Sequence, residues 1–592
     1  MSKKQNQLIG WALLSLLFVG YVQVFNKPPK GKSIQTQTEA TSDSQDTAHK
    51  EPSFMGEEEL AINAEQGKEV TLKNEKIKVT FSTQGGCIKA IELHDYTSYD
   101  DYQKGEKQPL KLLTGSRFDL VIPTPQGVIH TKDCLFEEVK SDDSQQITFI
   151  YRIPNQKNAY IRQNFSLNKA DYQLSCQVET RGIELTPESE GVILRWAQEV
   201  RRTERDAEIN KKDVVTYYQL TNKNKVKYSG YRNKKKEVTE LSEHVGWVAS
   251  NTKFFNTGII FEQPAQKATL TSLPVNNKQD PDLLKKVGMA FTLDRDQLLE
   301  EGHISFKLYC GPNIQQDLKT INAPRYKENY YLGTIPFWYI SQYFLLPIAK
   351  KLQDYTSSYL LILLVLLLIL TLIQLPLTYH NYLNSIREKA LTPMIAQIKK
   401  SSPEDPLKVQ MEERKLRNRA GIGFSIWNLF GMVFQIPMFI IMLNFINYNI
   451  GFRQASFLWI KDLSTYDSIL RLPFRVPYFG YSHISLVALL GSIGMLLPTW
   501  IKNRKKEKSN EESMMQYLPA ILFFLLFNGY SAAFNIYRVI SRLLNFIPTL
   551  FFGFFVDQEK VFQIVANNLA KNPSPASTIS RAHKRMMKKQ KK

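Results

Sequence analysis

The feature that most constrains this chain is the segregation of its apolar residues into long uncharged runs. The run Ser358–Leu377 carries no charge over about 20 residues, enough to cross a hydrocarbon core about 30 Å thick. Further apolar runs are Phe424–Ile446, Ser482–Trp500, Met514–Asn528 and Ser531–Phe555, and a sixth, Leu8–Phe25, lies near the start. The runs predict an α-helical membrane protein with an N-terminal anchor helix (1–26) and five core helices, at 358–377, 424–446, 482–500, 514–528 and 531–555.

The formal net charge of +20 indicates how the chain crosses the membrane. Basic residues are concentrated in three segments, 378–420, 501–513 and 556–592. The membrane potential and anionic inner lipids hold such segments in the cytoplasm. We therefore expect a multi-pass protein of the inner (plasma) membrane with both termini cytoplasmic and with residues 27–357 and 447–481 on the periplasmic side. No A-x-A-like site follows the first run, so we expect an uncleaved anchor rather than a signal peptide.

The long exported region has a different pattern. Residues 27–65 are polar and predict a flexible linker. From residue 66 apolar side chains alternate with polar ones, as at Ile77, Val79 and Phe81, which predicts a large all-β sandwich over 66–325. The segment Asn222–Lys236 is too basic for a core, and we expect an exposed loop there.

The chain's cysteines are all in this predicted β domain, at Cys87, Cys134, Cys176 and Cys310. An even number outside the cytoplasm permits disulfides in any of three pairings, and four buried thiols in a large core are the alternative. No CxxC motif or His/Cys cluster favours a metal.

Two amphipathic or charged segments flank the first core run. Residues 334–353 mix aromatics and leucines with terminal lysines, which predicts an interfacial helix, with a connector helix packed on the β domain as the alternative. Residues 378–420 contain three prolines, Pro393, Pro403 and Pro406. We interpret them as breaks in a cytoplasmic helical hairpin joined at Ser401–Pro406.

The last core run carries an unusual polar stripe. Its members are spaced 4, 3, 4 and 3 residues apart, within a wedge of roughly 80° on a helix, and are Ser531, Asn535, Arg538, Arg542 and Asn545. No Asp or Glu occurs in any apolar run. An arginine near the bilayer centre costs about 2.5–3.5 kcal/mol. Arg542 can instead extend to the headgroups, but Arg538 lies deeper and predicts water within the bundle.

Other polar residues are candidates for lining the same space. Thr371 and Gln374 share one helix face, as do Asn428 and Gln435. Each alone is explained by an interhelical hydrogen bond, but together with the stripe they favour a hydrated groove open to the cytoplasm. No nucleophile–base pair, phosphate-binding loop or metal-ligand spacing is present, so we expect no catalytic residues, no cofactor and no enzyme. A groove with one cation suits the passage of polar or acidic segments of nascent membrane proteins.

Several motifs resemble those of one known family. PLTYHNYLNSI (376–386), QIPMF (435–439), RQASFLWIKDLS (453–464) and FNGYSAAFNIYRVIS (527–541) are similar to the core of YidC-type membrane protein insertases. FSTQGGCIKAIEL (81–93) and GWVASNTKFF (246–255) are similar to the exported β-supersandwich of that family.

The resemblance implies insertion and folding of inner-membrane proteins, alone or with the Sec translocon, without nucleotide hydrolysis. The implied partners are nascent membrane proteins, the Sec translocon, the ribosome and anionic lipids, and no DNA. Basic segments suit ribosomal RNA or lipid equally, and the candidate contacts in the tail are Arg581, Lys584, Arg585, Lys588 and Lys589.

The family also implies a positively charged groove residue five positions before the proline of the PLT motif. That position is Thr371 in this sequence, whereas Arg538 falls where the family usually has an aromatic residue. We infer that the charge has moved from the second spanning helix to the last one. Two alternatives remain: a small-solute transporter or channel using the same groove, which predicts inverted repeats, and a glycan-processing enzyme in the β domain, which requires paired carboxylates.

Overall fold

The structure is a computed structural model that describes residues 67–572 with short gaps at 140–142, 155, 157, 188, 277–278, 296–297, 299–301, 331–336, 402–404, 423–425, 478 and 504–509. The predicted anchor (1–26), nearly all of the linker (27–65) and the basic residues after 572 lie outside the described residues. The described residues form two compact units, which we call the β unit (within Asn26–Thr334 and Tyr448–Ser456) and the helical unit (within Ile335–Asn447 and Phe457–Lys592).

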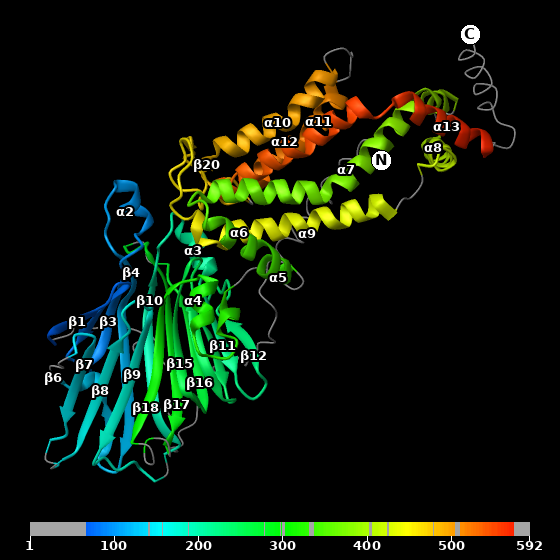
Figure 1. Ribbon diagram of the computed structural model, residues 1–592. Coiled ribbons are helices and arrows are strands. Elements are labelled where there is room, and N and C mark those ends of the chain that lie inside the picture. The colour runs from blue at the N-terminus through cyan, green and yellow to red at the C-terminus, as the bar shows by residue number, and fades with distance from the viewer. Residues whose placement is uncertain are drawn as a thin grey trace, which may run out of the picture. The chain divides into compact units, whose positions relative to one another are not determined.

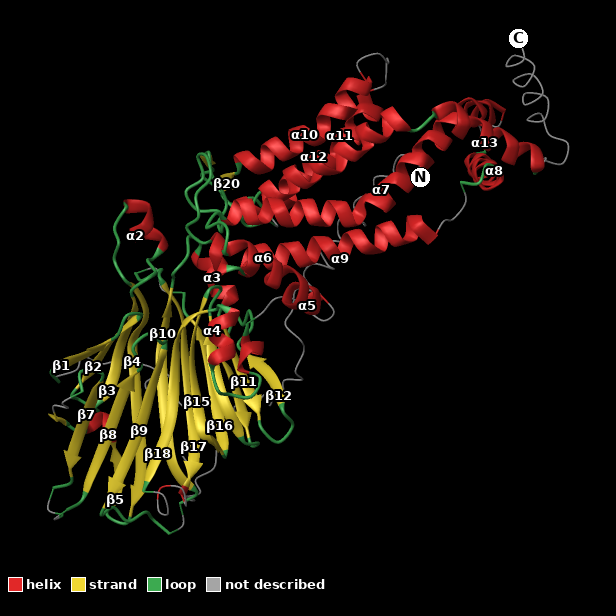
Figure 2. Cartoon of the chain, viewed as in Figure 1, coloured by secondary structure: helices red, strands yellow, loops and turns green. Residues whose placement is uncertain are grey.

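The β unit contains two large antiparallel sheets (Figures 1 and 2). The first has the order β1 (Glu69–Lys73), β2 (Ile77–Ser82), β3 (Cys87–Leu93), β4 (Leu110–Thr124), β10 (Gly191–Arg201), β17 (Leu283–Asp294), β16 (Lys267–Pro274) and β13 (Glu237–Leu241), with β5 (Gly127–His130) paired to β4. The second has the order β12 (Lys225–Ser229), β11 (Val215–Leu220), β14 (Val245–Asn251), β15 (Phe255–Ala265), β18 (His303–Pro312), β9 (Gln173–Arg181), β8 (Tyr160–Leu167), β7 (Gln146–Arg152) and β6 (Glu137–Val139). Short helices connect strands, namely α2 (Tyr99–Lys104), η1 (Thr131–Asp133) and α3 (Ala207–Asp213), and α4 (Gln315–Thr320) and η3 (Tyr326–Asn329) follow the last strand, β18.

Aromatic side chains join the two sheets. Phe81 of the first sheet lies 4.7 Å, ring centroid to ring centroid, from Phe165 of the second. Phe291 of the first sheet lies 4.8 Å from Phe261 of the second. Burial alternates residue by residue along β8, as the sequence pattern predicts for a strand with one face in a core. The predicted all-β domain is confirmed.

The four cysteines are free thiols, and all four are buried. Burial raises the pKa of Cys176 and Cys310, which keeps them protonated and unreactive. Of the two alternatives left open by the sequence, the structure has the buried thiols.

The segment Asn222–Lys236 differs from the expectation of a simple loop. It contains β12, an edge strand that pairs with β11 from Leu220↔Lys225 to Thr216↔Ser229. The exposed position of this strand is Lys225 and the half-buried Lys227 follows two residues later, and lysines blunt the open edge of a sheet.

The described part of the helical unit begins with α5 (Phe337–Ile340), a π-helical turn η4 (Ser341–Leu345) and α6 (Leu346–Gln353). The longer helices are α7 (Tyr359–Ser401), α8 (Pro406–Arg419), α9 (Ile426–Tyr448), α10 (Leu486–Asn503), α11 (Asn510–Phe527), α12 (Ala532–Phe555) and α13 (Gln558–Lys571). Among the described residues, α7 and α12 are long and apolar enough to cross a membrane, and the apolar parts of the others are shorter, at Pro437–Tyr448, Leu486–Leu496 and Tyr517–Phe527. The five predicted core spans stay a prediction.

The predicted helix break at Pro393 is wrong. Helix α7 runs through both Pro376 and Pro393 for 43 residues. An interior proline costs about 3 kcal/mol, but Leu391 and Met394 beside it are buried in an apolar cluster that offsets this cost. The hairpin joint itself follows Ser401, and the side chain of Asp405 caps α8 by accepting a hydrogen bond from the Lys408 amide.

The predicted basic tail 556–592 begins with the helix α13. Val561, Val565 and Leu569 are buried at four-residue spacing along α13. Val565 and Leu569 pack into the same cluster as the α7–α8 hairpin. The four-residue spacing of these apolar residues is present in the sequence, but the basic residues that follow them dominate the composition of the tail.

Candidate functional site

The predicted polar stripe lies on α12, whose first turn is fixed by other segments of the helical unit. The backbone amides of Ala532 and Ala533 donate to the carbonyls of Thr465 and Leu463. These bonds satisfy amides that a helix N-terminus leaves free. Ser531 Oγ donates to Asn447 Oδ1 of α9 at 3.0 Å. The start of α12 is therefore held against the end of α9.

The guanidinium of Arg538 lies within a cage of three phenylalanines. Its carbon is 3.7 Å from the ring centroid of Phe527, 4.1 Å from Phe523 and 5.1 Å from Phe439. These rings come from α11 and α9, so three helices form the cage. Cation–π attraction offsets part of the cost of removing the charge from water. Among the described residues the guanidinium has no ion pair, and its Nη1 is buried without a hydrogen-bond partner.

Sequence reasoning missed a further polar residue in this region, Asn444 of α9. It is fully buried, and both polar atoms of its side chain lack partners. Asn535 is also buried and donates to the Phe527 carbonyl at 3.1 Å, but its Oδ1 has no partner. The signal was present, because Asn444 interrupts an otherwise apolar run three residues before Asn447.

Asn444 and Asn535 lie on facing stretches of α9 and α12. The Ser531–Asn447 hydrogen bond stands at one end of this stretch, and the Phe439–Phe534 ring contact at 5.3 Å stands deeper. Buried polar atoms in native proteins are almost always bonded to protein or water. Four such atoms here, on Asn444, Asn535 and Arg538, have no protein partner.

The other predicted site residues are placed differently. Arg542 is exposed, with its guanidinium 5.2 Å from the Phe523 ring. Thr371 is buried, and its Oγ1 donates to the Leu367 carbonyl of its own helix at 2.8 Å. Gln374 is half-buried on α7. The side chains of Asn428 and Gln435 and the basic residues Arg581, Lys584, Arg585, Lys588 and Lys589 lie outside the described part of the structure.

A polar network fixes the segment before α10. The carboxylate of Asp467 accepts hydrogen bonds from Ser485 Oγ and from the Val487 amide at the start of this helix. Asn528 Nδ2 donates to the His483 carbonyl at 2.7 Å, and its Oδ1 accepts from the Ser485 amide at 2.8 Å. This network joins the start of α10 to the turn that follows α11, the helix that carries Phe523 and Phe527 beside Arg538.

The motif RQASFLWIKDLS begins inside the β unit. Arg453 Nε donates to Glu204 Oε1 at 2.7 Å, and Arg453 Nη2 donates to the Thr97 carbonyl at 2.6 Å. Gln454 Nε2 also donates to the Thr97 carbonyl, at 3.0 Å, and its own carbonyl accepts from Tyr102 at 2.9 Å. These contacts explain why an arginine and a glutamine open this motif.

Comparison with known proteins gives two family matches. Residues 351–558 match the family described as 60Kd inner membrane protein, and residues 69–346 match the YidC periplasmic domain. The membrane protein insertase YidC of Amoebophilus asiaticus is 29% identical over 588 residues, which are 96% of this chain and 95% of that protein. The membrane protein insertase YidC of Phocaeicola vulgatus is 27% identical over 582 residues, which are 92% of this chain and 90% of that protein. A crystal structure of an active YidC insertase with its first transmembrane domain resolved is 14% identical, covers 82% of this chain and 93% of that one, and has a TM-score of 0.32.

The chain is thus an inner-membrane protein with a large periplasmic β domain followed by a helical region. It belongs to the YidC family. The named relatives are insertases and not enzymes, in agreement with the prediction that this chain is not an enzyme.

Proposed function

We propose that this protein inserts and helps to fold integral membrane proteins, alone or with the Sec translocon, through a hydrated groove among its spanning helices. The supporting observation is the guanidinium of Arg538, which is caged by three aromatic rings and has no anion beside it among the described residues. An acidic or polar group of a nascent chain supplies the partner that this cation lacks.

The groove opens toward the cytoplasm in this proposal. Along α12, Ser531 to Ile536 are buried, whereas Arg542, Leu543 and Asn545 are exposed. The Ser531–Asn447 hydrogen bond closes the other end. A polar segment therefore enters from the Arg542 end, meets Arg538, and proceeds no further while its hydrophobic helix moves sideways into lipid.

The Arg538 charge replaces the charge that the family usually carries at the Thr371 position. Tyr379 of α7 lies 5.0 Å from Phe552 of α12, ring centroid to ring centroid, which sets the register of these two helices. Counting back eight residues from this contact places Thr371 level with Leu544. Arg538 lies six residues before Leu544, about 9 Å deeper at 1.5 Å per residue.

The cytoplasmic surfaces provide the proposed contacts with the ribosome and with anionic lipids. Lys400, Arg414 and Lys415 are exposed on the α7–α8 hairpin. Anionic RNA and lipid headgroups are both attracted by such a cluster. The basic residues after 572 extend this charge in the sequence.

Site-directed crosslinking to a ribosome-stalled nascent membrane protein tests the groove. A photoreactive residue at position 538 or 435 should crosslink to the substrate's spanning segment, and one at position 550, an exposed residue of α12, serves as the comparison. Crosslinks only from position 550 would contradict the proposed groove.

A further inference from the structure

One cationic surface of the β unit is unused by the proposed groove. We call residues 222–236, which comprise β12 and the turns on either side, the basic hairpin. It contains no Asp or Glu, and its cations are Lys223, Lys225, Lys227, Arg232, Lys234, Lys235 and Lys236. Lys223 pairs with Glu243 at 2.9 Å. Lys225, Lys234 and Lys235 are exposed and have no ion pair with any described residue.

The basic hairpin is held in place by a lysine from the other sheet. Lys285 of β17 is fully buried, and its Nζ donates to the Val214 carbonyl at 2.9 Å, the Gly230 carbonyl at 2.7 Å and Asn233 Oδ1 at 2.8 Å. An ammonium group without such bonds is costly to bury. Because two of its three hydrogen bonds are made to this segment, Lys285 fixes the turn that carries Arg232, Lys234 and Lys235.

Gly230 completes this anchoring. Its φ is +74°, and a Cβ there would lie 2.7 Å from Ser272 Oγ. The side-chain amide of Asn233 donates to the Ser272 carbonyl at 2.9 Å. The turn therefore sits directly on β16, and its cations project from a fixed backbone.

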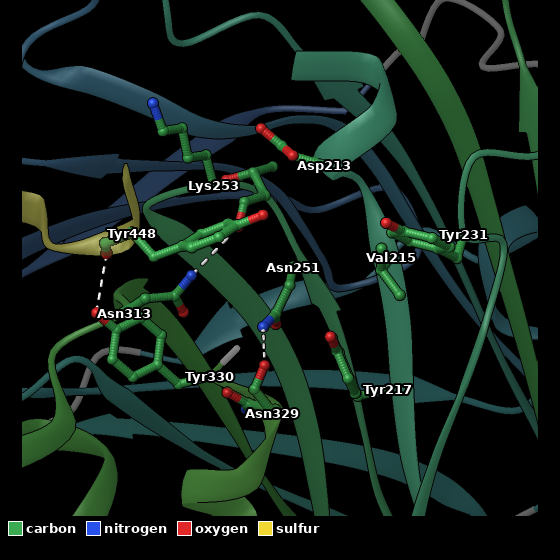
Figure 3. Close-up of a pocket in the computed structure, with 11 residues that line it drawn as sticks. Asp213, Val215, Tyr217, Tyr231, Asn251, Lys253, Asn313, Asn329, Tyr330 and Tyr448 are labelled. Atoms are coloured by element: carbon green, nitrogen blue, oxygen red, sulfur yellow. Dashed lines mark hydrogen bonds between the residues drawn. The ribbon is translucent and has the colours of Figure 1, made fainter. Parts of the chain in front are cut away.

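The turn 230–236 of the basic hairpin lies at the end of the β unit that carries Tyr330 and Tyr448. A cavity of about 30 Å³ is lined by Tyr231 of the hairpin, Asp213, Tyr330 and Tyr448 (Figure 3). The Tyr330 hydroxyl donates to the Tyr448 carbonyl at 2.8 Å. Tyr448 is the last residue of α9, and Tyr330 precedes α5 by a few residues. If α9 crosses the bilayer, as the proposed function requires, this end of the β unit is at the membrane surface.

Aromatic residues accompany the cations. The Arg232 guanidinium lies 5.1 Å from the Tyr231 ring, and Tyr231 lies 5.9 Å from Tyr228. Tyrosine together with Lys and Arg is typical of the membrane–water interface, where rings lie among headgroups and cations meet phosphates. This combination favours a lipid surface over an acidic protein.

We propose that the basic hairpin binds the phosphate headgroups of anionic phospholipids in the outer leaflet of the inner membrane. The cations are held on a rigid turn, so little conformational freedom is lost on binding. Through this contact the periplasmic domain rests on the bilayer. The proposal rests on the membrane topology of the proposed function but not on the groove.

Lysine footprinting of the full-length protein tests this contact. The protein is placed in nanodiscs of phosphatidylcholine alone or of phosphatidylcholine with phosphatidylglycerol, and the rate of amine acylation is measured by mass spectrometry. In discs with phosphatidylglycerol, Lys234 and Lys235 should react about fivefold more slowly, the effect expected for one basic residue at an anionic surface. The protection should fade at high salt, because salt screens this attraction.

The control is Lys267 of β16. It pairs with Thr292, which lies seven residues along β17 from Lys285, a distance of about 24 Å. Its rate should be the same in both discs. In the variant Lys234→Glu with Lys235→Glu, the protection of Lys225 should also be lost. Equal rates for Lys234 in both discs, or protection that appears only in crude membranes, would overturn the proposal. Insertion activity is not the readout, so a failure of the groove leaves this result interpretable.

Discussion

Arg453 and Glu204 form a buried ion pair within the β unit, with 2.7 Å between Arg453 Nε and Glu204 Oε1, although 249 residues separate them in the sequence. Their side chains are only 2% and 10% exposed. The Arg453 guanidinium also lies 5.1 Å from the Phe255 ring. The segment between α9 and α10 is thus part of the β unit for nine residues, Tyr448–Ser456.

Removing one partner of this pair should release the segment. Arg453→Ala leaves the Glu204 carboxylate buried without its cation, which typically costs 3–5 kcal/mol, whereas replacing both partners by neutral residues costs less. Hydrogen exchange of residues 448–456 in the detergent-solubilised protein should therefore accelerate more in Arg453→Ala than in Arg453→Met with Glu204→Gln. Equal acceleration in both variants would show that the ion pair itself does not hold the segment.

Loss of the Arg538 charge should impair insertion selectively. Arg538→Ala should reduce insertion of a substrate with an acidic translocated tail by at least about tenfold, since about 1.4 kcal/mol of charge interaction corresponds to that factor. A substrate with a neutral tail should be affected less. The measurement is protease protection of substrates in proteoliposomes, with Arg538→Lys, which keeps the charge, as the matched control. If Arg538→Ala inserts the acidic substrate as well as wild type, the hypothesis that the groove charge has moved to Arg538 is wrong.

An arginine at position 371 should restore part of this activity. Thr371→Arg in the Arg538→Ala background returns a cation to α7, about 9 Å nearer the cytoplasm. Rescue should be partial, because substrates are met at a shallower depth. In the same assay, Thr371→Gln serves as a polar control without charge, and rescue by both substitutions would show that polarity rather than charge is needed.

Substitution of Asn444 distinguishes a hydrated helix bundle from a dry one. In a dry core, Asn444→Leu removes two unsatisfied polar atoms and should stabilise the protein by about 1–3 kcal/mol with insertion unchanged. In a hydrated groove the same change displaces water, so insertion should fall without a comparable gain in stability. Thermal unfolding in detergent and the insertion assay together distinguish these outcomes.

The stability of the β unit should depend on the protonation of Asp213. Burial raises the pKa of this carboxyl from 3.8 to about 6, against the opposing effect of Lys253, Arg232 and Lys212. The folded state therefore binds more protons than the unfolded state between pH 4 and 6, and stability should fall as the pH rises through this window. Asp213→Asn should remove this dependence of stability on pH. At pH 7.5 the variant should be more stable than wild type by at most about 3 kcal/mol, and by less because Asp213 is partly exposed. Denaturation followed by the fluorescence of the buried Trp196 and Trp247 checks this, and the two proteins should coincide at pH 4.

The sequence predicted the parts of the fold that depend on local periodicity. Alternation at Ile77, Val79 and Phe81 predicted strands, and the spacing of Ser531, Asn535 and Arg538 placed them on one helix face that the structure brings against α9. Both patterns are set by the repeat of one element, so they can be recognised without a partner.

Contacts between distant segments could not be predicted in the same way. The cage around Arg538 uses rings from α9 and α11, and nothing in the spacing of α12 indicates which rings face it. The Arg453–Glu204 pair joins segments that no local pattern connects. The helix break predicted at Pro393 is wrong because the tertiary packing of Leu391 and Met394 outweighs the preference of proline for helix ends.

Helix α7 is continuous for 43 residues, about 65 Å at 1.5 Å per residue, roughly twice the thickness of the hydrocarbon core. Its far end is clamped by α8 and α13, and its middle contacts α12 through Tyr379 and Tyr382 against Phe552. The α7–α8 hairpin and the stretch of α7 that packs on α12 are therefore joined by one unbroken helix, and Pro376 and Pro393 inside it are the points where such a helix bends.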